Sequence, residues 1–362
     1  MKLKKKKIIT IIGTRPEIIR LSRLIPKLDK KYHNILVHTG QNYDYELDQI
    51  FLKELNVRKP NYYLNARGSF AAQISTIIFK LEKIIKKEKP EKFLVLGDTN
   101  SSVGSIVAKR MGVKVYHMEA GNRCFSSKSP EEVNRKIIDH TSDVLLPYTA
   151  GSRKNLLMEG IKSKDIIITG NPITEVIDFN QTNIRNSKII KKLDLKKNNF
   201  FVLTMHRQEN VDNYQVFKRF ILTFNKIVIK FDKKIIWPIH PRSNKMLKLN
   251  KIFLDPRIVL VKPLGFFDFV KLEKDCLMTL TDSGTVQEES AILKKPCLII
   301  REYTERLETI KAGGAKLVGS NTKKILDTIN FYLRNDIKIK VIRDYANKNV
   351  SAKIIKILKS KI

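Results

Sequence analysis

Cysteine is scarce in this chain of 362 residues, which contains only Cys124, Cys276 and Cys297. The three lie far apart and form no Cys-x-x-Cys pair, so the sequence offers neither a disulfide framework nor the spacing of a zinc site. Reduced thiols are typical of the cytoplasm. We therefore expect a cytoplasmic protein without a metal site.

Long hydrophobic runs are also absent. No run approaches the roughly 18 apolar residues that a helix needs to span a bilayer. The apolar stretch at residues 8–12 is too short for the core of a signal peptide, and charged residues follow it at once. We expect neither export nor membrane insertion.

Acidic residues are few beside the basic ones, since 36 Asp and Glu oppose 70 Lys and Arg, for a formal net charge of +34. Such an excess raises the question of nucleic-acid binding. The excess is mostly lysine, however, and no RRM, KH, zinc-finger or helix-turn-helix pattern accompanies it. We favour solvated lysine-rich surfaces over a nucleic-acid partner. An anionic small substrate or an anionic membrane surface would also suit this charge.

Several cofactor and catalytic motifs are missing. The sequence has no Gly-x-Gly-x-x-Gly fingerprint, no Walker loop, no His-Glu-x-x-His and no Gly-x-Ser-x-Gly. A dinucleotide is therefore not expected, and we predict that no cofactor takes part.

The sequence does contain a regular alternation of short apolar runs with longer amphipathic stretches, such as the helices predicted at 16–28 and 70–87. The runs predict strands at 7–12, 34–38, 92–96, 113–117, 143–147 and 166–169, and then at 200–204, 234–239, 258–261, 277–281 and 297–300. We therefore predict an α/β fold of two facing Rossmann-like, doubly wound domains at 1–176 and 177–345, followed by a C-terminal helix at 346–362. Ligands of such sheets bind beyond the carboxyl ends of the strands, which predicts a site between the two halves.

Polar residues follow the first predicted strand, where Gly13-Thr14-Arg15-Pro16-Glu17 opens a helix. Proline suits a first helical turn. The free amides of the helix N-terminus, together with Arg15, predict a phosphate site. A tight turn alone would explain the glycine and the proline but not the polar residues beside them.

Three carboxylates, those of Asp98, Glu119 and Glu131, lie at or near strand ends of the same half. Carboxylates that are brought together repel one another, so that one pKa tends to rise into the range useful for general acid–base chemistry. Helix capping is the alternative for Asp98 and Glu131, which both stand at predicted helix starts.

The second half carries a similar set of polar residues. His206 and His240 each follow a predicted strand with an arginine close behind, and either could donate to a phosphate. Ser283-Gly284-Thr285 joins a strand to a helix and predicts a second phosphate cradle. Glu289 lies one turn further on, where a carboxylate could bind ribose hydroxyls. Two cradles suit a nucleoside diphosphate with a group attached, so the residues indicate a nucleotide-sugar enzyme.

Together these motifs resemble those of the non-hydrolysing UDP-N-acetylglucosamine 2-epimerases, a family with the glycosyltransferase-B-like fold. The resemblance extends from Ile11 to about Gly319, with the motifs in the family's order. They read Gly13-Thr-Arg-Pro-Glu17, His38-Thr-Gly-Gln41, Gly97-Asp-Thr99, Glu119-Ala-Gly121, Pro130-Glu-Glu-x-Asn-Arg135, Gly170-Asn-Pro172, His206-Arg-x-Glu-Asn210, His240-Pro-x-Ser243, Thr281-Asp-Ser-Gly284 and Thr304-Glu-Arg306.

The resemblance implies a role for each matching position, and it implies a homodimer. The catalytic residues that it implies are Asp98, Glu119, Glu131 and His206. The substrate-binding residues that it implies are Arg15 near the diphosphate, Arg20 where the family usually has lysine, His240, Leu264 and Phe269 near the uracil, Ser283, Gly284 and Thr285 in the phosphate loop, Glu289 at the ribose, and Arg306.

The activity that the resemblance implies is epimerisation at C2 of a UDP-N-acetylhexosamine, with UDP-GlcNAc to UDP-ManNAc as the first expectation, for the supply of surface polysaccharide. The C2 hydrogen is not next to a carbonyl carbon, so simple deprotonation would leave an unstabilised carbanion. Without NAD, a transient ketone is not expected either. Elimination of UDP to a 2-acetamidoglucal, followed by re-addition, meets both conditions.

The chain departs from the family pattern in a few places. The stretch at 119–125 and the loop Ser283-Gly284-Thr285 resemble a branch in which some members act on other UDP-N-acetyl sugars, including 6-deoxy-talose-type sugars and diacetamido-uronic acids. Residues 41–45 differ from the stretch that belongs to the family's allosteric UDP-GlcNAc site, so the resemblance does not extend to that site. Leu307 replaces a usual proline.

Three further activities stay open on the sequence alone. A glycosyltransferase of the same fold would use the same nucleotide cradles, because fold alone does not decide function. It needs an acceptor site, however, rather than proton transfer on two faces of a sugar, and the carboxylates favour the epimerase. A non-catalytic nucleotide-sugar binder and the hydrolysing variant of the epimerase are the remaining two.

Overall fold

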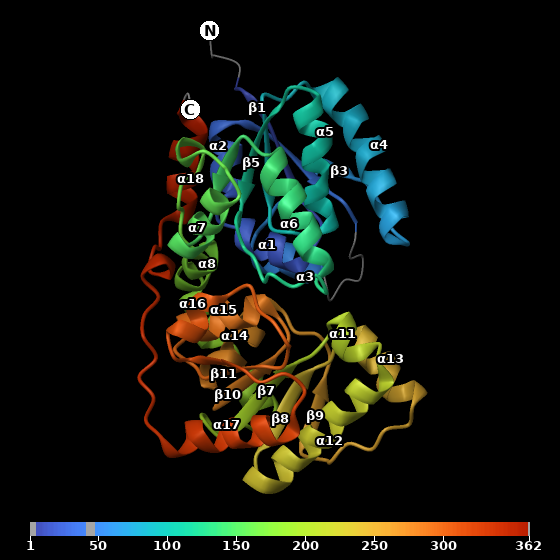
Figure 1. Ribbon diagram of the computed structural model, residues 1–362, viewed down its shortest axis with the longest axis vertical. Coiled ribbons are helices and arrows are strands. Elements are labelled where there is room, and N and C mark those ends of the chain that lie inside the picture. Colours follow the sequence, from blue (N-terminus) through green and yellow to red (C-terminus); the bar gives the residue numbers. More distant parts are fainter. Residues whose placement is uncertain (1–4, 41–47, 361–362) are drawn as a thin grey trace. The chain divides into compact units, whose positions relative to one another are not determined.

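The computed structural model describes residues 5–40 and 48–360, and the chain forms two units (Figure 1). The first unit comprises residues 1–179 and 343–362, and the second comprises residues 180–342. The chain therefore leaves the first unit, builds the second and returns. Residues 41–45, which set this chain apart from the usual family pattern, lie outside the described residues.

The first unit contains a six-stranded sheet in the order β3-β2-β1-β4-β5-β6, in which all neighbouring strands are parallel. This order is the Rossmann order. The strands are β1 (Lys7–Ile12), β2 (His33–His38), β3 (Tyr62–Tyr63), β4 (Lys92–Leu96), β5 (Lys114–Met118) and β6 (Val144–Leu146). The inner strands are apolar along almost their whole length because helices cover a parallel sheet on both faces.

The helices of the first unit follow the strands in the expected alternation. They are α1 (Arg15–Leu21), α2 (Ile25–Lys31), α3 (Gln49–Glu54), α4 (Phe70–Glu88), η2 (Asn100–Gly104), α5 (Ser105–Arg110), α6 (Pro130–Thr141), α7 (Ala150–Met158), η3 (Ser163–Asp165), α8 (Pro172–Phe179), η4 (Arg343–Tyr345) and α18 (Val350–Lys359). The last helix, α18, packs against α2 and α8, so the C-terminal segment completes the first unit.

The second unit repeats the strand order as β9-β8-β7-β10-β11-β12, again with parallel neighbours. Its strands are β7 (Phe200–Thr204), β8 (Lys234–Pro238), β9 (Ile258–Val261), β10 (Met278–Thr281), β11 (Cys297–Ile299) and β12 (Ala315–Leu317). Its helices are α9 (Gln181–Asn186), α10 (Ile189–Lys192), α11 (Gln208–Val211), α12 (Tyr214–Phe231), α13 (Pro241–Leu249), α14 (Phe266–Asp275), α15 (Gly284–Ile292), α16 (Leu307–Lys311) and α17 (Thr322–Arg334). The predicted α/β fold of two Rossmann-like domains is confirmed.

Two predicted elements are wrong in detail. The strand predicted at 166–169 is a single bridge between Ile166 and Leu145, because the edge strand β6 has only three residues to pair with. The helix predicted at 16–28 is two helices, since Pro26 lies in the first turn of α2, where its missing N–H costs nothing. Among the described residues, no helix is both long and apolar enough to be a candidate membrane span.

Candidate functional site

The polar motifs of the first unit meet at one edge of its sheet. Strands β1, β4 and β5 are neighbours in the sheet. Residues 13–17, 97–99 and Glu119 follow their carboxyl ends. Because parallel strands end at the same edge, the fold brings these segments together, and it does so at the edge where α/β proteins bind ligands.

The turn after β1 requires glycine. A Cβ at Gly13 would lie 1.9 Å from Thr39 Oγ1 and 2.2 Å from Ser101 Oγ, far closer than any real contact. These two hydroxyls bond to each other at 2.7 Å and hold the neighbouring loops against the turn. The close approach of three backbone segments therefore depends on the missing side chain.

Glu17 is buried beneath this turn and ties two loops together. Its Oε2 accepts the backbone N–H groups of Gly13 and Thr14, and its Oε1 accepts the hydroxyl of Thr99, next to Asp98. Burial raises the pKa of Glu17 from 4.5 to about 7, against the opposing effect of these three bonds. The sequence analysis gave Glu17 no role, although a threonine three residues before a glutamate is the signal of a capping box, and the bond from the Thr14 backbone N–H to Glu17 is one half of that motif.

The two arginines of α1 have different surroundings. Arg15 opens the helix and is half-buried, with its guanidinium carbon 5.9 Å from the centre of the Phe51 ring. Arg20 is buried and forms an ion pair with Glu119, and its guanidinium carbon lies 6.0 Å from the centre of the Tyr148 ring. The structure thus brings together Arg20 and Glu119, two of the sequence-predicted site residues.

Glu119 has an unusual backbone conformation for a residue other than glycine, with φ at +66°. Such a conformation costs on the order of 1–3 kcal/mol and persists only where the surrounding contacts hold it. Asn122 donates to its Oε1 at 3.3 Å, and its Oε2 lies 3.7 Å from the position of a Cβ on Gly97. The carboxylate of Glu119 therefore lies against the loop that carries Asp98.

Asp98 is held by residues of α6. Arg135 donates to Asp98 Oδ2 from Nε at 2.8 Å and pairs with it through Nη2 at 2.7 Å, while Nη1 bonds Glu132 Oε2 at 2.8 Å. The amide of Asn134 donates to the backbone oxygen of Asp98 at 2.9 Å. The sequence analysis quoted Arg135 within a motif but gave it no role. The spacing of Glu132 and Arg135, three residues apart on a helix, was the available signal.

Glu131 lies in the first turn of the same helix and is half-buried. The hydroxyl of Ser129, at the position just before the helix, donates to Glu131 Oε2 at 3.0 Å. A negative charge is also favourable at a helix N-terminus. This contact and its position place Glu131 at the N-terminus of α6, the helix that also holds Asp98.

A buried network behind Glu119 was missed by the sequence analysis. Asp139 is 2.8 Å from both His117 Nδ1 and Arg123 Nη2 and accepts the backbone N–H of Gly121. Burial would raise the pKa of Asp139, but the charges and bonds of His117 and Arg123 outweigh burial and lower it. This network anchors the loop that begins at Glu119.

In the second unit, Asp282 organises the residues after β7. Its Oδ2 accepts the backbone N–H groups of His206 and Arg207, each at 2.9 Å, and the amide of Asn210 at 3.2 Å. Its Oδ1 is 3.3 Å from His206 Nδ1, so Nε2 is on the far side of the ring. Burial raises the pKa of Asp282, although these bonds oppose the shift. The sequence analysis quoted Asp282 only within a motif.

The two histidines of the second unit lie together. The ring centres of His206 and His240 are 5.5 Å apart. His240 is the N-cap of α13, where its Nδ1 accepts the backbone N–H of Arg242 at 3.2 Å and Pro241 takes the first helical position. The structure therefore gives His240 a capping role in addition to its place beside His206.

The predicted phosphate loop stands at the start of α15. Ser283 is the N-cap, and its backbone N–H donates to Thr281 Oγ1 at 2.9 Å. Gly284 and Thr285 form the first turn. A Cβ on Gly284 would lie 2.8 Å from Glu305 Oε1, so a larger residue would displace that carboxylate. The helix N-terminus presents backbone amides that suit a phosphate.

Arg306 lies in a buried cluster of charges next to Gly284. It pairs with Glu288 through Nε and is 3.4 Å from Glu305 through Nη1. Arg301, also buried, is 3.3 Å from the other oxygen of Glu305. Two arginines thus balance two glutamates behind the predicted phosphate loop. The sequence analysis gave Glu288 no role.

The remaining predicted residues of the second unit are partly or wholly covered. Glu289 is buried on α15, with 2% of its surface exposed. Leu264 and Phe269 are half-buried and pack against an apolar cluster that includes Phe200 and Val202. Packing alone therefore accounts for much of the burial of Leu264 and Phe269. Among residues 5–40 and 48–360, no group of three or more His, Cys, Asp or Glu side chains is arranged to hold a metal ion.

Known proteins are similar to this chain over most of its length. Residues 27–359 match the family described as UDP-N-acetylglucosamine 2-epimerase. A UDP-N-acetylglucosamine 2-epimerase of Methanococcus maripaludis is 40% identical over 340 residues, which are 91% of this chain and 92% of that one. A UDP-2,3-diacetamido-2,3-dideoxy-D-glucuronate 2-epimerase of Pseudomonas aeruginosa is 32% identical over 340 residues, which are 92% of this chain and 94% of that one.

A solved structure gives the same answer for the fold. The UDP-GlcNAc 2-epimerase of Methanocaldococcus jannaschii, solved in complex with UDP-GlcNAc and UDP, aligns with a TM-score of 0.92 at 38% identity, over 97% of this chain and 99% of that one. The two parallel sheets with their surrounding helices are thus the glycosyltransferase-B-like architecture of these enzymes.

Proposed function

Since the chain belongs to the UDP-N-acetylglucosamine 2-epimerase family, we propose that it inverts C2 of a UDP-N-acetylhexosamine, with UDP-GlcNAc to UDP-ManNAc as the leading conversion. The observation that carries this proposal is the pair of carboxylates, Asp98 and Glu119, held at neighbouring strand ends by Arg135 and Arg20. The cytoplasm is the proposed location, as the scarcity of cysteine predicts.

The proposed reaction begins with an elimination. A carboxylate removes the proton from C2 while the bond between C1 and the diphosphate oxygen breaks, so that the electrons of the C–H bond form the C1=C2 double bond and UDP leaves. The product is a 2-acetamidoglucal. A proton is then delivered to the opposite face of C2, and a UDP oxygen re-adds at C1. No net oxidation occurs, which is consistent with a reaction that needs no redox cofactor.

The first unit supplies the groups for proton transfer in this proposal. Asp98, Glu119 and Glu131 all belong to it, and general acid–base groups typically contribute about 10²–10⁴-fold to a rate. The ion pairs with Arg135 and Arg20 hold the carboxylates of Asp98 and Glu119 in place.

The leaving diphosphate needs positive charge and N–H donors. In the second unit, His206 and the amide groups at the start of α15 provide them, with the side chain of His206 oriented by Asp282. Arg15 provides a further cation from the first unit. The uracil and ribose contacts proposed for Leu264, Phe269, Glu289 and Arg306 follow from the family resemblance.

A related UDP-N-acetyl sugar is the alternative substrate. The relative of Pseudomonas aeruginosa named as a UDP-2,3-diacetamido-2,3-dideoxy-D-glucuronate 2-epimerase supports it. The loop Ser283-Gly284-Thr285, where the family usually has glycine in the third place, points in the same direction. A glycosyltransferase remains the alternative of another class, and turnover without an acceptor would separate it from an epimerase.

Incubation of the protein with UDP-GlcNAc in D₂O tests the proposal directly. We expect proton NMR to show the anomeric signal of UDP-ManNAc and a loss of the C2 proton signal, because the proton that returns to C2 comes from solvent. Product without deuterium at C2 would contradict the elimination. If UDP-GlcNAc neither reacts nor exchanges, the same test on the 6-deoxy and uronic-acid UDP sugars decides between the alternative substrates and a binding protein.

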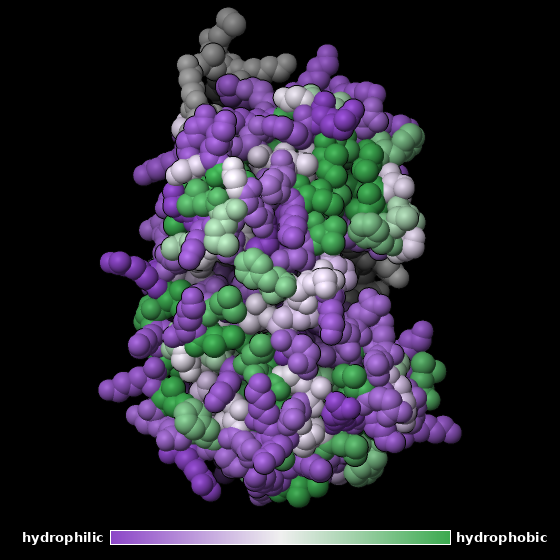
Figure 2. Space-filling view, in the orientation of Figure 1, coloured by the Kyte–Doolittle hydropathy of each residue, from purple (hydrophilic) through white to green (hydrophobic). Residues whose placement is uncertain are grey.

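We also propose a homodimer that forms through the helices α4, α5 and α6. Figure 2 shows apolar side chains gathered over the part of the first unit where Figure 1 places these neighbouring helices. On these helices Phe79 and Val133 are 58% and 59% exposed, and Ile74, Ile78 and Ile137 are half-buried. A contiguous apolar face of this kind marks an interaction surface. The family resemblance makes a second copy of the chain its occupant.

The double variant Phe79→Glu, Val133→Glu is expected to be a monomer under conditions in which the unchanged protein is a dimer, as measured by light scattering after size exclusion. Both side chains are exposed, so the charges disturb the interface rather than the core. The matched control is Leu222→Glu, Ile229→Glu on α12, where the side chains are 52% and 63% exposed. If the Phe79→Glu, Val133→Glu variant were still a dimer and the control variant were a monomer, the result would contradict this interface.

A further inference from the structure

Lysines gather at the amino edge of the sheet of the first unit, at the opposite ends of the strands from the candidate site. Lys92 begins β4 and Lys114 begins β5, and the two residues are partners in the parallel ladder. Partners in a parallel sheet project on the same face, so the two lysine side chains start from neighbouring positions. Like charges in neighbouring positions destabilise a sheet, which makes this pair a feature that needs an explanation.

Two basic pockets lie on either side of this edge and share Tyr32. Successive side chains of a strand point to opposite faces. Lys5 and Lys7 accordingly line one pocket, of about 590 Å³, and Lys6 lines the other, of about 330 Å³. The two pockets differ in how their cations are compensated.

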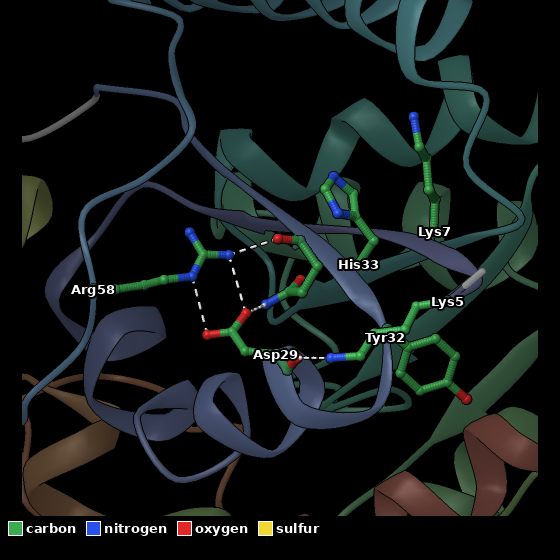
Figure 3. Close-up of a pocket in the computed structure, with 7 residues that line it drawn as sticks. Lys5, Lys7, Asp29, Tyr32, His33 and Arg58 are labelled. Carbon is green, nitrogen blue, oxygen red and sulfur yellow. Dashed lines mark hydrogen bonds and ion pairs between the residues drawn. The ribbon is translucent and has the colours of Figure 1, made fainter. Parts of the chain in front are cut away.

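The larger pocket contains its own counter-ion. Arg58 holds both oxygens of Asp29 at 3.0 Å and donates to the backbone oxygen of Asn34, and Asn34 also donates to Asp29 (Figure 3). Lys5 donates to the backbone oxygen of Asp29. These contacts tie α2 to the strands, so a structural role explains the charges of this pocket.

The smaller pocket, which we call the lysine pocket, has a different composition. Five lysines from five different segments line it together with Tyr32, and the described residues that line it include no carboxylate. The lysines are Lys6 before β1, Lys31 at the end of α2, Lys92 in β4, Lys114 in β5 and Lys359 at the end of α18. Lys6 pairs with Glu91 at 2.6 Å. Lysine is favourable at a helix C-terminus, which accounts for two of the five but not for those in the strands.

Lys92 is the most confined of the five. Its ammonium donates to the hydroxyl of Tyr116 at 3.0 Å and lies 5.1 Å from the centre of that ring. Burial lowers the pKa of Lys92, the charge of Lys6 lowers it further, and the charge of Glu91 opposes the shift in part. The hydroxyl of Tyr116 is uncharged, so it compensates the positive charge of the Lys92 ammonium only in part. An anion in the pocket would relieve the repulsion between Lys6 and Lys92.

We propose that the lysine pocket binds a small anion that carries two or more linked phosphate groups. Its volume of about 330 Å³ lies at the lower end of the range for small-molecule sites. The lysines converge on a hollow from several directions, whereas an anionic membrane would need charges spread over an outward face. Lysine binds phosphate as a compact charge with three donors. The proposal does not depend on the proposed epimerase activity, because the pocket lies at the other edge of the sheet.

Tripolyphosphate is the probe for this site. The full chain is first saturated with UDP, so that the probe cannot occupy the predicted diphosphate site, and is then titrated by calorimetry. We expect one further molecule to bind per chain. In the variant Lys31→Gln, Lys114→Gln, Lys359→Gln, the affinity is expected to fall by about tenfold or more because three charged contacts are removed. Lys92 is left in place because it is partly buried.

The control variant is Lys154→Gln, Lys164→Gln, Lys323→Gln, which loses the same charge at exposed positions that do not line the pocket. It is expected to bind the probe like the unchanged protein. Equal weakening in both variants would overturn the proposal, since net charge would then explain the binding. No binding to the UDP-saturated protein would also overturn it, and so would pocket-dependent binding to phosphatidylserine vesicles without binding to tripolyphosphate. Thermal melting is the measurement that checks whether both variants are folded.

Discussion

Replacement of Asp98 by Asn is expected to lower kcat by roughly 10²–10⁴-fold, the range that a general acid or base contributes. The carboxylate stands at the carboxyl end of β4 and is held through Oδ2 by Arg135. Asn keeps the shape of Asp and can still accept a bond from Arg135, but it cannot take up a proton. We therefore expect a small change in KM and a proportional loss of deuterium incorporation at C2. The measurement is single-substrate kinetics with NMR detection on the UDP sugar that the enzyme turns over.

Asp143→Asn is the matched control for this variant. Its side chain is 26% exposed, against 24% for Asp98, and it also bonds a cation, Lys109. Asp143 accepts the backbone N–H of Val115 near the amino end of β5, away from the candidate site. We expect unchanged kinetics. If Asp98→Asn retained the rate of the unchanged enzyme, or if both variants lost activity equally, Asp98 would have no direct part in proton transfer.

The sequence was informative about the fold because buried parallel strands are continuous apolar runs. The runs at 200–204 and 258–261, for instance, are the strands β7 and β9. The strands that it missed lie at the edges of the sheets and are short. β3 has two residues, and β12 is Ala315-Lys316-Leu317, in which a lysine interrupts the apolar run. An edge strand is defined by its neighbour rather than by its own composition, so periodicity alone does not reveal it.

The sequence predicted those site residues that stand at the ends of predicted strands, and it did not predict the residues that hold them. The motifs placed Asp98 and Glu119 at one edge because the fold class places all carboxyl ends there. Their partners could not be predicted, since Arg20 is 99 residues from Glu119 and Arg135 is 37 residues from Asp98. That Glu288 pairs with Arg306 depends on the rotation of α15 in its packing, which one helical turn of sequence does not encode.

The ionisation of Glu17 is expected to have a large effect on the free energy of unfolding. The sign of this effect follows from the pKa of Glu17. Burial raises this pKa to about 7, whereas the unfolded chain has the ordinary value of 4.5. Below pH 4.5 both states hold the proton, and between 4.5 and about 7 only the folded state does. Since the folded state then binds more protons than the unfolded state, the free energy of unfolding falls as the pH rises through this interval. The shift corresponds to about 3 kcal/mol.

Glu17→Gln removes this dependence and keeps the local contacts. The glutamine Oε1 can accept the N–H groups of Gly13 and Thr14. Its amide can donate to the hydroxyl of Thr99, which in the unchanged protein donates to the carboxylate. The other titrating groups are common to both proteins, so their effects cancel in the comparison. Urea unfolding at pH 4.5 and pH 8 is expected to show that the variant gains about 3 kcal/mol relative to the unchanged protein between the two values. A difference between the two proteins that stays constant with pH would mean that Glu17 is ionised in the folded state throughout. Its bonds to the two backbone amides and to Thr99 would then fully offset the cost of burying its charge.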